Sequence, residues 1–164
     1  MVDRYFERPL FYDYTVALLL CGIFYFLKYK GMISLPTDET SLSTTTDLST
    51  ISLTLAGFVL TLLTVLVTFK TGARIPNGQN NEDVPLFDLF FSTSLYYKTT
   101  ALLKNCIKSL VFVSILGFSL KLFLTGVLVQ YLFFSNILGL IIIVTTLARS
   151  IMILTKIIDL QKDT

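Results

Sequence analysis

The sequence contains an apolar run from Leu48 to Phe69 that carries no charge and is bounded by Asp47 and Lys70. About 20 predominantly apolar residues in a helix are enough to cross the hydrocarbon core of a bilayer. Inside that core, only helices and closed barrels satisfy their own backbone hydrogen bonds. The run therefore predicts a transmembrane helix. The composition agrees, because 54% of the residues are hydrophobic and only 15% are charged.

A second apolar stretch runs from about Leu10 to Leu27, is interrupted by Asp13, and is followed by Lys28 and Lys30. Phe11, Tyr12 and Tyr14 suit the aromatic belt at a membrane interface. A cleavable signal peptide needs small residues after its apolar part, and Lys28-Tyr-Lys30 stands there instead. We expect a retained membrane helix.

The stretch from Ser109 to Ala148 has one charge, Lys121, and is too long for a single crossing. We expect a hairpin whose turn lies near Phe133 to Asn136, where Ser and Asn can cap the following helix. The sequence thus predicts an all-α polytopic membrane protein, a single membrane domain over 1–164 with two helical hairpins. Its four transmembrane helices are expected at about 10–27, 48–69, 110–132 and 137–155.

Lysine and arginine in short flanking segments predict the orientation. Only Lys28 and Lys30 lie on one side of the predicted membrane; the other side has Lys70, Arg74, Lys98, Lys104 and Lys108, with Arg4, Arg8, Lys156 and Lys162 in the terminal segments. We therefore expect both termini in the cytoplasm. The Ser/Thr-rich segment 31–47 is predicted to be a flexible extracytoplasmic loop. Residues 72–108 are predicted to be a cytoplasmic loop followed by an interfacial helix over about 86–105.

Several function classes are disfavoured by residue types that the chain lacks. It has no His, and a net charge of +2 is too small to indicate direct nucleic-acid binding. Its two cysteines, Cys21 and Cys106, lie in or beside apolar segments, as ordinary buried thiols do. Motifs for binding nucleotides or for metal or serine catalysis are absent from the sequence. We expect neither an enzyme nor a cofactor or metal site.

Small polar residues recur along the predicted second helix at alternating spacings of three and four. At about 100° per residue they share one face of that helix. Such a face either packs closely against another helix or lines water. We call this set the threonine face: Thr50, Thr54, Gly57, Thr61, Thr64 and Thr68.

The predicted third helix carries a shorter seam of Ser114, Gly117, Lys121 and Thr125. If that helix starts near Leu110, Lys121 lies close to the middle of the membrane, where insertion of a lysine costs about 2.5 to 3.5 kcal/mol. Three interpretations are open. Lys121 faces a water-filled cavity or pore, it pairs with Asp13, or the helix boundary is misplaced and Lys121 is interfacial.

Asp13 and Arg149 are expected at similar shallow depths near the cytoplasmic side. Arg149 should lie about 9 Å from a helix end near Thr155, so that its head could also reach water by snorkelling. The sequence therefore predicts either an intramembrane ion pair between the two side chains or two solvated heads.

The plan resembles the small four-helix membrane effectors of bacterial antiphage defence systems, of the kind found in the Hailong and Kiwa systems. The resemblance covers the whole chain as architecture and rests on the helix containing 55–69 and on the helical hairpin after the basic segment 98–108. It implies a homo-oligomer that a cytosolic regulatory protein keeps silent and that is released on infection to depolarise or permeabilise the inner membrane.

We therefore expect a multi-pass protein of the bacterial inner membrane that assembles with itself in the lipid bilayer into an ion channel or pore. Candidate lining residues are the threonine face and the seam of Lys121. The alternative is a structural membrane anchor that recruits a cytosolic partner through the basic segment 86–108, with Lys98, Lys104 and Lys108 as candidate contacts.

Overall fold

The computed structural model describes residues 9–72 and 94–162, and all of its regular elements are helical. Four helices are long and apolar enough to cross a membrane, which confirms the predicted number within these ranges. The elements are α2 (Pro9–Tyr29), α3 (Asp38–Gly72), α5 (Ser94–Phe123), the 3₁₀ helix η1 (Gly126–Tyr131) and α6 (Leu132–Lys162).

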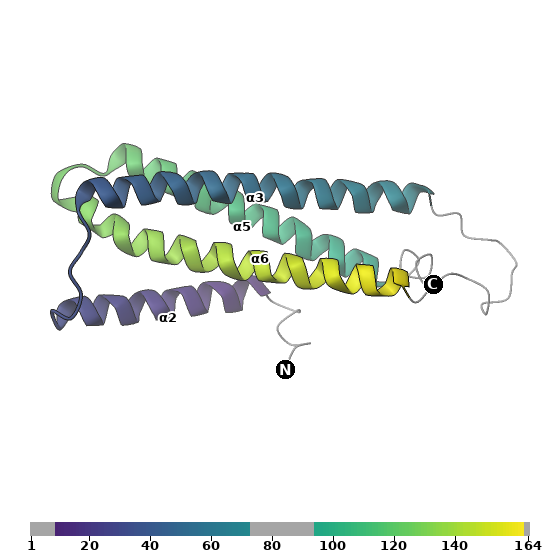
Figure 1. Ribbon diagram of the computed structural model, residues 1–164, viewed down its shortest axis with the longest axis horizontal. Coiled ribbons are helices and arrows are strands. Elements are labelled where there is room, and N and C mark those ends of the chain that lie inside the picture. The colour runs from purple at the N-terminus through teal and green to yellow at the C-terminus, as the bar shows by residue number, and fades with distance from the viewer. Residues whose placement is uncertain (1–8, 73–93, 163–164) are drawn as a thin grey trace, which may run out of the picture.

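Each α-helix runs antiparallel to the next one along the chain, so that α3 and α6 run in the same direction (Figure 1). Helix α3 packs along α5, and α6 contacts α2, α3 and α5. Helix α2 packs chiefly against α6. Helices α3, α5 and α6 thus form a compact trio, with α2 attached on the side of α6.

Helix α3 begins much earlier than predicted, at Asp38, so most of the expected flexible loop 31–47 is helical. Thr37 caps the start, because the backbone N–H of Thr40 donates to its hydroxyl at 3.4 Å. Asp38 and Glu39 place negative charge in the first turn, which the helix dipole favours. Ser41 is buried within the bundle. Packing on this polar side explains why a segment of low complexity is ordered.

Helix α5 is continuous from Ser94 to Phe123, whereas the sequence predicted an interfacial helix over 86–105 and a separate membrane helix over 110–132. Residues 86–93 lie outside the described part of the chain. Leu103, Cys106, Leu110 and Val113 are buried at helical spacing on both sides of the expected break. One continuous buried face therefore joins the two predicted pieces.

The turn between α5 and α6 also differs from the prediction, which placed it at 133–136. Thr125 is extended, and Gly126 has a φ of 61°. This left-handed conformation is easy only for glycine and ends the path of α5. Asn136 does not cap a helix: it lies inside α6 and is buried against α3. Helix α6 also continues beyond the predicted end at 155, to Lys162.

The core lies among α3, α5 and α6, where Val59, Leu103, Leu110 and Ile142 are each about 1% exposed. Helix α2 contributes Ala17 to this core. Many large apolar side chains on α2 and α3 point outward instead, as expected for helices in contact with lipid.

Aromatic residues hold the end of α2 against the start of α6. Phe24 packs edge-on against Phe133, and Tyr25 lies against Phe134 with ring centroids 5.7 Å apart. The Lys28 ammonium lies 5.2 Å from the ring centroid of Tyr131. A lysine and aromatic rings together are typical of a membrane interface.

Candidate functional site

Asp13 of α2 and Arg149 of α6 form an ion pair in the interior of the bundle. Arg149 Nη1 donates to Asp13 Oδ2 at 2.7 Å, and the two side chains are 0% and 4% exposed. Arg149 Nε also donates to Cys106 Sγ of α5 at 3.3 Å. The guanidinium therefore joins three helices. Of the two predicted arrangements, the structure has the ion pair and not the solvated heads.

The position of this pair agrees with the shallow depth expected from the sequence, because Asp13 lies near the start of the apolar span Leu10–Tyr29 and Arg149 lies six residues before the end of the span Leu128–Thr155. Helix α6 itself continues beyond this apolar span, to Lys162. Breaking a buried charge pair by removing one partner typically costs 3–5 kcal/mol, because the other charge is left uncompensated. The pair thus helps to fix α2 to α6, alongside the aromatic contacts at the other end of the two helices.

The threonine face points away from the bundle. All six of its residues are exposed. Its hydroxyls bond to carbonyls of their own helix four residues earlier, at 2.9 to 3.0 Å. Gly57 has open space where a Cβ would be. The face therefore forms a polar stripe along the outside of α3.

The inner side of α3 carries a different polar seam, which the sequence reasoning missed. It consists of Ser41, Thr45, Ser49 and Ser52, all no more than 2% exposed. Thr45 donates to Asn136 Oδ1 at 2.9 Å, and Asn136 Nδ2 donates to the carbonyl of Ser41 at 3.0 Å. Ser52 donates to the carbonyl of Leu110 at 2.6 Å. The seam residues have helical spacing in the sequence. The spacing was not interpreted as a helix face because the segment 31–47 was expected to be a loop.

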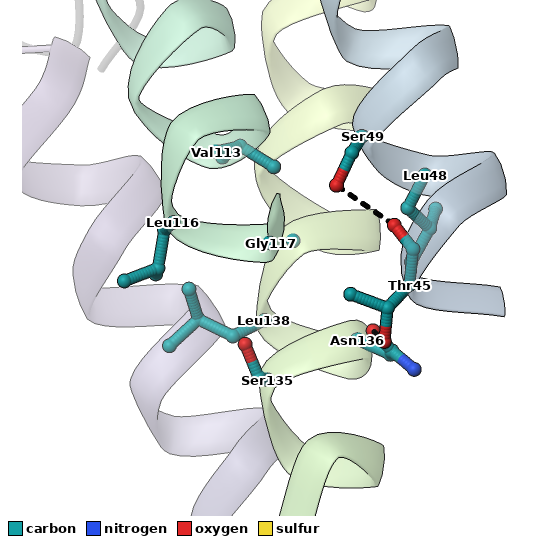
Figure 2. Close-up of a pocket in the computed structure, with 10 residues that line it drawn as sticks. Thr45, Leu48, Ser49, Val113, Leu116, Gly117, Ser135, Asn136 and Leu138 are labelled. Atoms are coloured by element: carbon teal, nitrogen blue, oxygen red, sulfur yellow. Dashed lines mark hydrogen bonds between the residues drawn. The ribbon is translucent and has the colours of Figure 1, made fainter. Parts of the chain in front are cut away.

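A small pocket lies where this seam meets α5 and α6. Thr45 and Ser49 approach it from α3, Gly117 from α5 and Asn136 from α6, while Leu116 and Leu138 close the apolar side (Figure 2). Its volume of about 20 Å³ is room for about one water molecule. It is too small to be a path for ions through the subunit.

Gly117, one of the candidate lining residues, is part of helix packing. A Cβ at this position would collide with Ser49 Oγ, so the absence of a side chain allows α3 and α5 to approach closely. Ser114 is 3% exposed and lies inside the bundle. Neither residue faces a lumen in the subunit, and Thr125 lies in the connection to η1.

Lys121 lies in the last turn of α5, two residues before the helix ends. Its side chain is exposed, and Nζ donates to Thr46 Oγ1 of α3 at 2.6 Å. Thr46 lies just before the charge-free run 48–69, so Lys121 is level with one border of that run. The expectation that Lys121 lies near the middle of a helix over 110–132 is therefore wrong, because α5 ends at Phe123. Its position agrees with the interfacial interpretation.

The opposite end of the α3–α5 pair is marked by Lys70. Its ammonium donates to the Tyr97 hydroxyl at 3.0 Å and lies 4.3 Å and 4.1 Å from the ring centroids of Tyr96 and Tyr97. Cation–π contact favours this arrangement. Lys70 and Tyr97 therefore define the second border of the charge-free run, at the far end from Lys121.

Lys98, Lys104 and Lys108 are exposed side chains on the continuous helix α5. Lys98 and Lys104 do not lie on a separate interfacial helix as predicted. Counted from Tyr97, Lys108 lies about 16 Å along α5 at 1.5 Å per residue, between the two borders described above. Of the lysines on α5, Lys108 therefore lies farthest from both borders. The sequence had predicted this position for Lys121.

Comparisons with protein-family models, curated proteins and solved structures found no match. The resemblance to antiphage effectors stays an expectation from the sequence.

Proposed function

We propose that the protein is a homo-oligomeric ion channel or pore whose lumen is formed between subunits by the threonine face of α3. Four apolar helices make it a multi-pass membrane protein. We place it in the bacterial inner membrane with both termini in the cytoplasm, following the distribution of lysine and arginine. In the defence role suggested by the resemblance, opening of the pore depolarises that membrane.

The outward direction of the threonine face carries this proposal. A hydroxyl stripe along about 27 Å of helix, from Thr50 to Thr68, is nearly as long as the hydrocarbon core is thick. Its hydroxyls are already bonded to their own helix, so they need no partner inside the subunit. A water-filled lumen is where such a polar wall serves a function.

The small size of the pocket between the described helices supports assembly from several copies. The pocket among α3, α5 and α6 holds about one water, and Thr45, Ser49 and Ser52 of the polar seam beside it donate hydrogen bonds within the bundle. Closed cyclic symmetry places the same face of every copy around one axis. Lining residues on an outer face are what such a ring requires.

Substituting the middle of the threonine face tests this function. We expect Thr61→Leu to reduce the current of the purified protein in a planar bilayer at least tenfold, because a ring of leucines narrows and dewets the lumen. Thr15→Leu is the matched control. Thr15 is an exposed threonine of α2 whose hydroxyl donates to the carbonyl of Phe11 at 2.6 Å, so its loss should leave the current unchanged.

The same measurement separates the pore from the membrane-anchor alternative. An anchor for a cytosolic partner gives no current and should tolerate Thr61→Leu. If both threonine variants conduct like the wild-type protein, the lumen does not lie on this face. A wild-type protein that does not conduct, either alone or when co-reconstituted with a cytosolic extract, contradicts the pore.

A further inference from the structure

We infer that adjacent copies of the protein are joined by an ion pair between Asp47 of one copy and Lys121 of the next. This inference rests on the proposed function and deepens it, because it names a contact that closes the ring around the lumen. Three features of the structure support it: the positions of the two charges around α3, the level of Asp47, and the lack of an ion pair to Asp47 within the subunit.

The two charges lie on opposite flanks of the threonine face. At about 100° per residue, Asp47 lies about 20° beyond Thr54, which is one edge of that face. Thr46 has the same angular position as Thr64, the other edge, because the two residues are about five helical turns apart. The ammonium of Lys121 donates to Thr46 Oγ1 at 2.6 Å, and both charged side chains are exposed. One flank therefore carries a carboxylate and the other an ammonium.

Asp47 is level with the apolar part of α2. The Cys21 thiol of α2 contacts the carbonyl of Phe134 in α6, with Sγ and O 3.7 Å apart. Asn136, two residues further along α6, bonds to Thr45 of α3. Since α3 and α6 run in the same direction (Figure 1), Asp47 lies at the level of Cys21 or slightly deeper in the bundle.

This level is unfavourable for an uncompensated carboxylate. Lys28, which marks the interface together with its aromatic neighbours, is seven residues after Cys21 and therefore about 10 Å nearer the membrane surface. At the level of Asp47, α2 exposes the apolar side chains of Leu19 and Ile23. A lysine can extend its ammonium toward the interface, but the short side chain of aspartate cannot. Charged side chains in membrane segments pair with one another or face water, so Asp47 needs a cation or water beside it.

The subunit supplies no paired cation to Asp47. Among the residues that the structure describes, no ion pair involves its carboxylate. Lys121 is the described cation at this level, but its ammonium is bonded to Thr46, on the opposite flank of the threonine face. In a ring that turns this face toward the axis, each flank of one α3 is directed toward the opposite flank of a neighbouring α3. Lys121 of the neighbour therefore lies opposite Asp47, since symmetry about the membrane normal keeps all copies level.

Such a contact also favours closure of the ring. Each copy brings one carboxylate and one ammonium to two different contacts, which is a head-to-tail arrangement. A closed ring pairs all of these charges, whereas an open chain leaves one carboxylate and one ammonium unpaired at its ends.

Disulfide trapping tests whether the contact runs between copies. Asp47→Cys and Lys121→Cys carry different tags and are co-expressed, and the membranes are then oxidised. We expect a reducible dimer that carries both tags on non-reducing gels. Leu19→Cys co-expressed with Lys121→Cys is the matched control, because Leu19 is exposed at the same level on α2, and it should give at least tenfold less mixed dimer. The wild-type protein should give none, since Cys106 is buried and Cys21 is half-buried.

Exchange of the two charges tests whether the contact is electrostatic. We expect Asp47→Lys and Lys121→Asp each to reduce the oligomeric fraction several-fold in size-exclusion chromatography in detergent, because each places like charges opposite one another. The double variant Asp47→Lys/Lys121→Asp restores opposite charges and should recover the wild-type fraction. Lys30→Asp changes an exposed charge just after α2 and should leave the fraction unchanged.

The outcomes separate the ion pair from the pore. Absence of the mixed dimer in a protein that conducts and that Thr61→Leu blocks overturns the ion pair and leaves the pore intact. A disulfide confined to single chains of Asp47→Cys/Lys121→Cys, without multimers, assigns the pair to one subunit and also overturns the inference. A wild-type protein that is monomeric in detergent and does not conduct ends both proposals. If the charge variants do not insert into the membrane, the neutral cysteine variants decide.

Discussion

At the residue scale, the buried charges of Asp13 and Arg149 link α2 to α6. Their contact could be anticipated because Asp13 is the one acid inside the first apolar stretch and Arg149 interrupts the last. Its third partner, the Cys106 thiol, could not, since it depends on how α5 packs. Lys121 was misplaced for a related reason: its depth depends on a helix end set by Thr125 and Gly126.

We expect Arg149→Gln and Asp13→Asn each to destabilise the bundle by about 3–5 kcal/mol, because each leaves one buried charge without its partner. The double variant Asp13→Asn/Arg149→Gln removes both charges and should lose less than the sum of the two single variants. Thermal unfolding in detergent, followed by circular dichroism, measures these differences. Strict additivity would mean that the two charges do not interact in the folded protein.

At the element scale, the existence of four apolar helices was predictable, because each needs only a run of sufficient length. Their ends were not, since packing decides them. The first three turns of α3 are polar in sequence and become ordered through Ser41, Thr45 and Asn136. The threonine face was predictable as a face, but only the packing of the other helices shows that it points outward.

The close approach of α3 and α5 at Gly117 gives a test at this scale. We expect Gly117→Val to destabilise the subunit by about 1–3 kcal/mol, because the new side chain overlaps Ser49. Gly57→Val is the matched control, since nothing lies within 4 Å of a Cβ at Gly57. The control should unfold within about 1 kcal/mol of the wild-type protein. Equal losses in both variants would place Gly117 outside the helix contact.

At the scale of the whole molecule, the described helices enclose a polar seam and carry a second polar stripe on the outside of α3. Its inner seam, with the pocket for about one water, fixes three helices together. Its outer stripe consists of the threonine face of α3. A pore between copies uses both features, because a rigid subunit holds the lining residues at a constant position around the axis.

The most direct test of that pore is chemical access to Thr61 while current flows. In Thr61→Cys, a negatively charged methanethiosulfonate reagent added to the aqueous phase should reduce the planar-bilayer current progressively and irreversibly. The wild-type protein is the first control, since Cys106 is buried and Cys21 is half-buried. Thr15→Cys is the second control, and neither should respond. Current that Thr61→Cys keeps unchanged after exposure, with the thiol shown to be unmodified, would contradict a lumen lined by the threonine face.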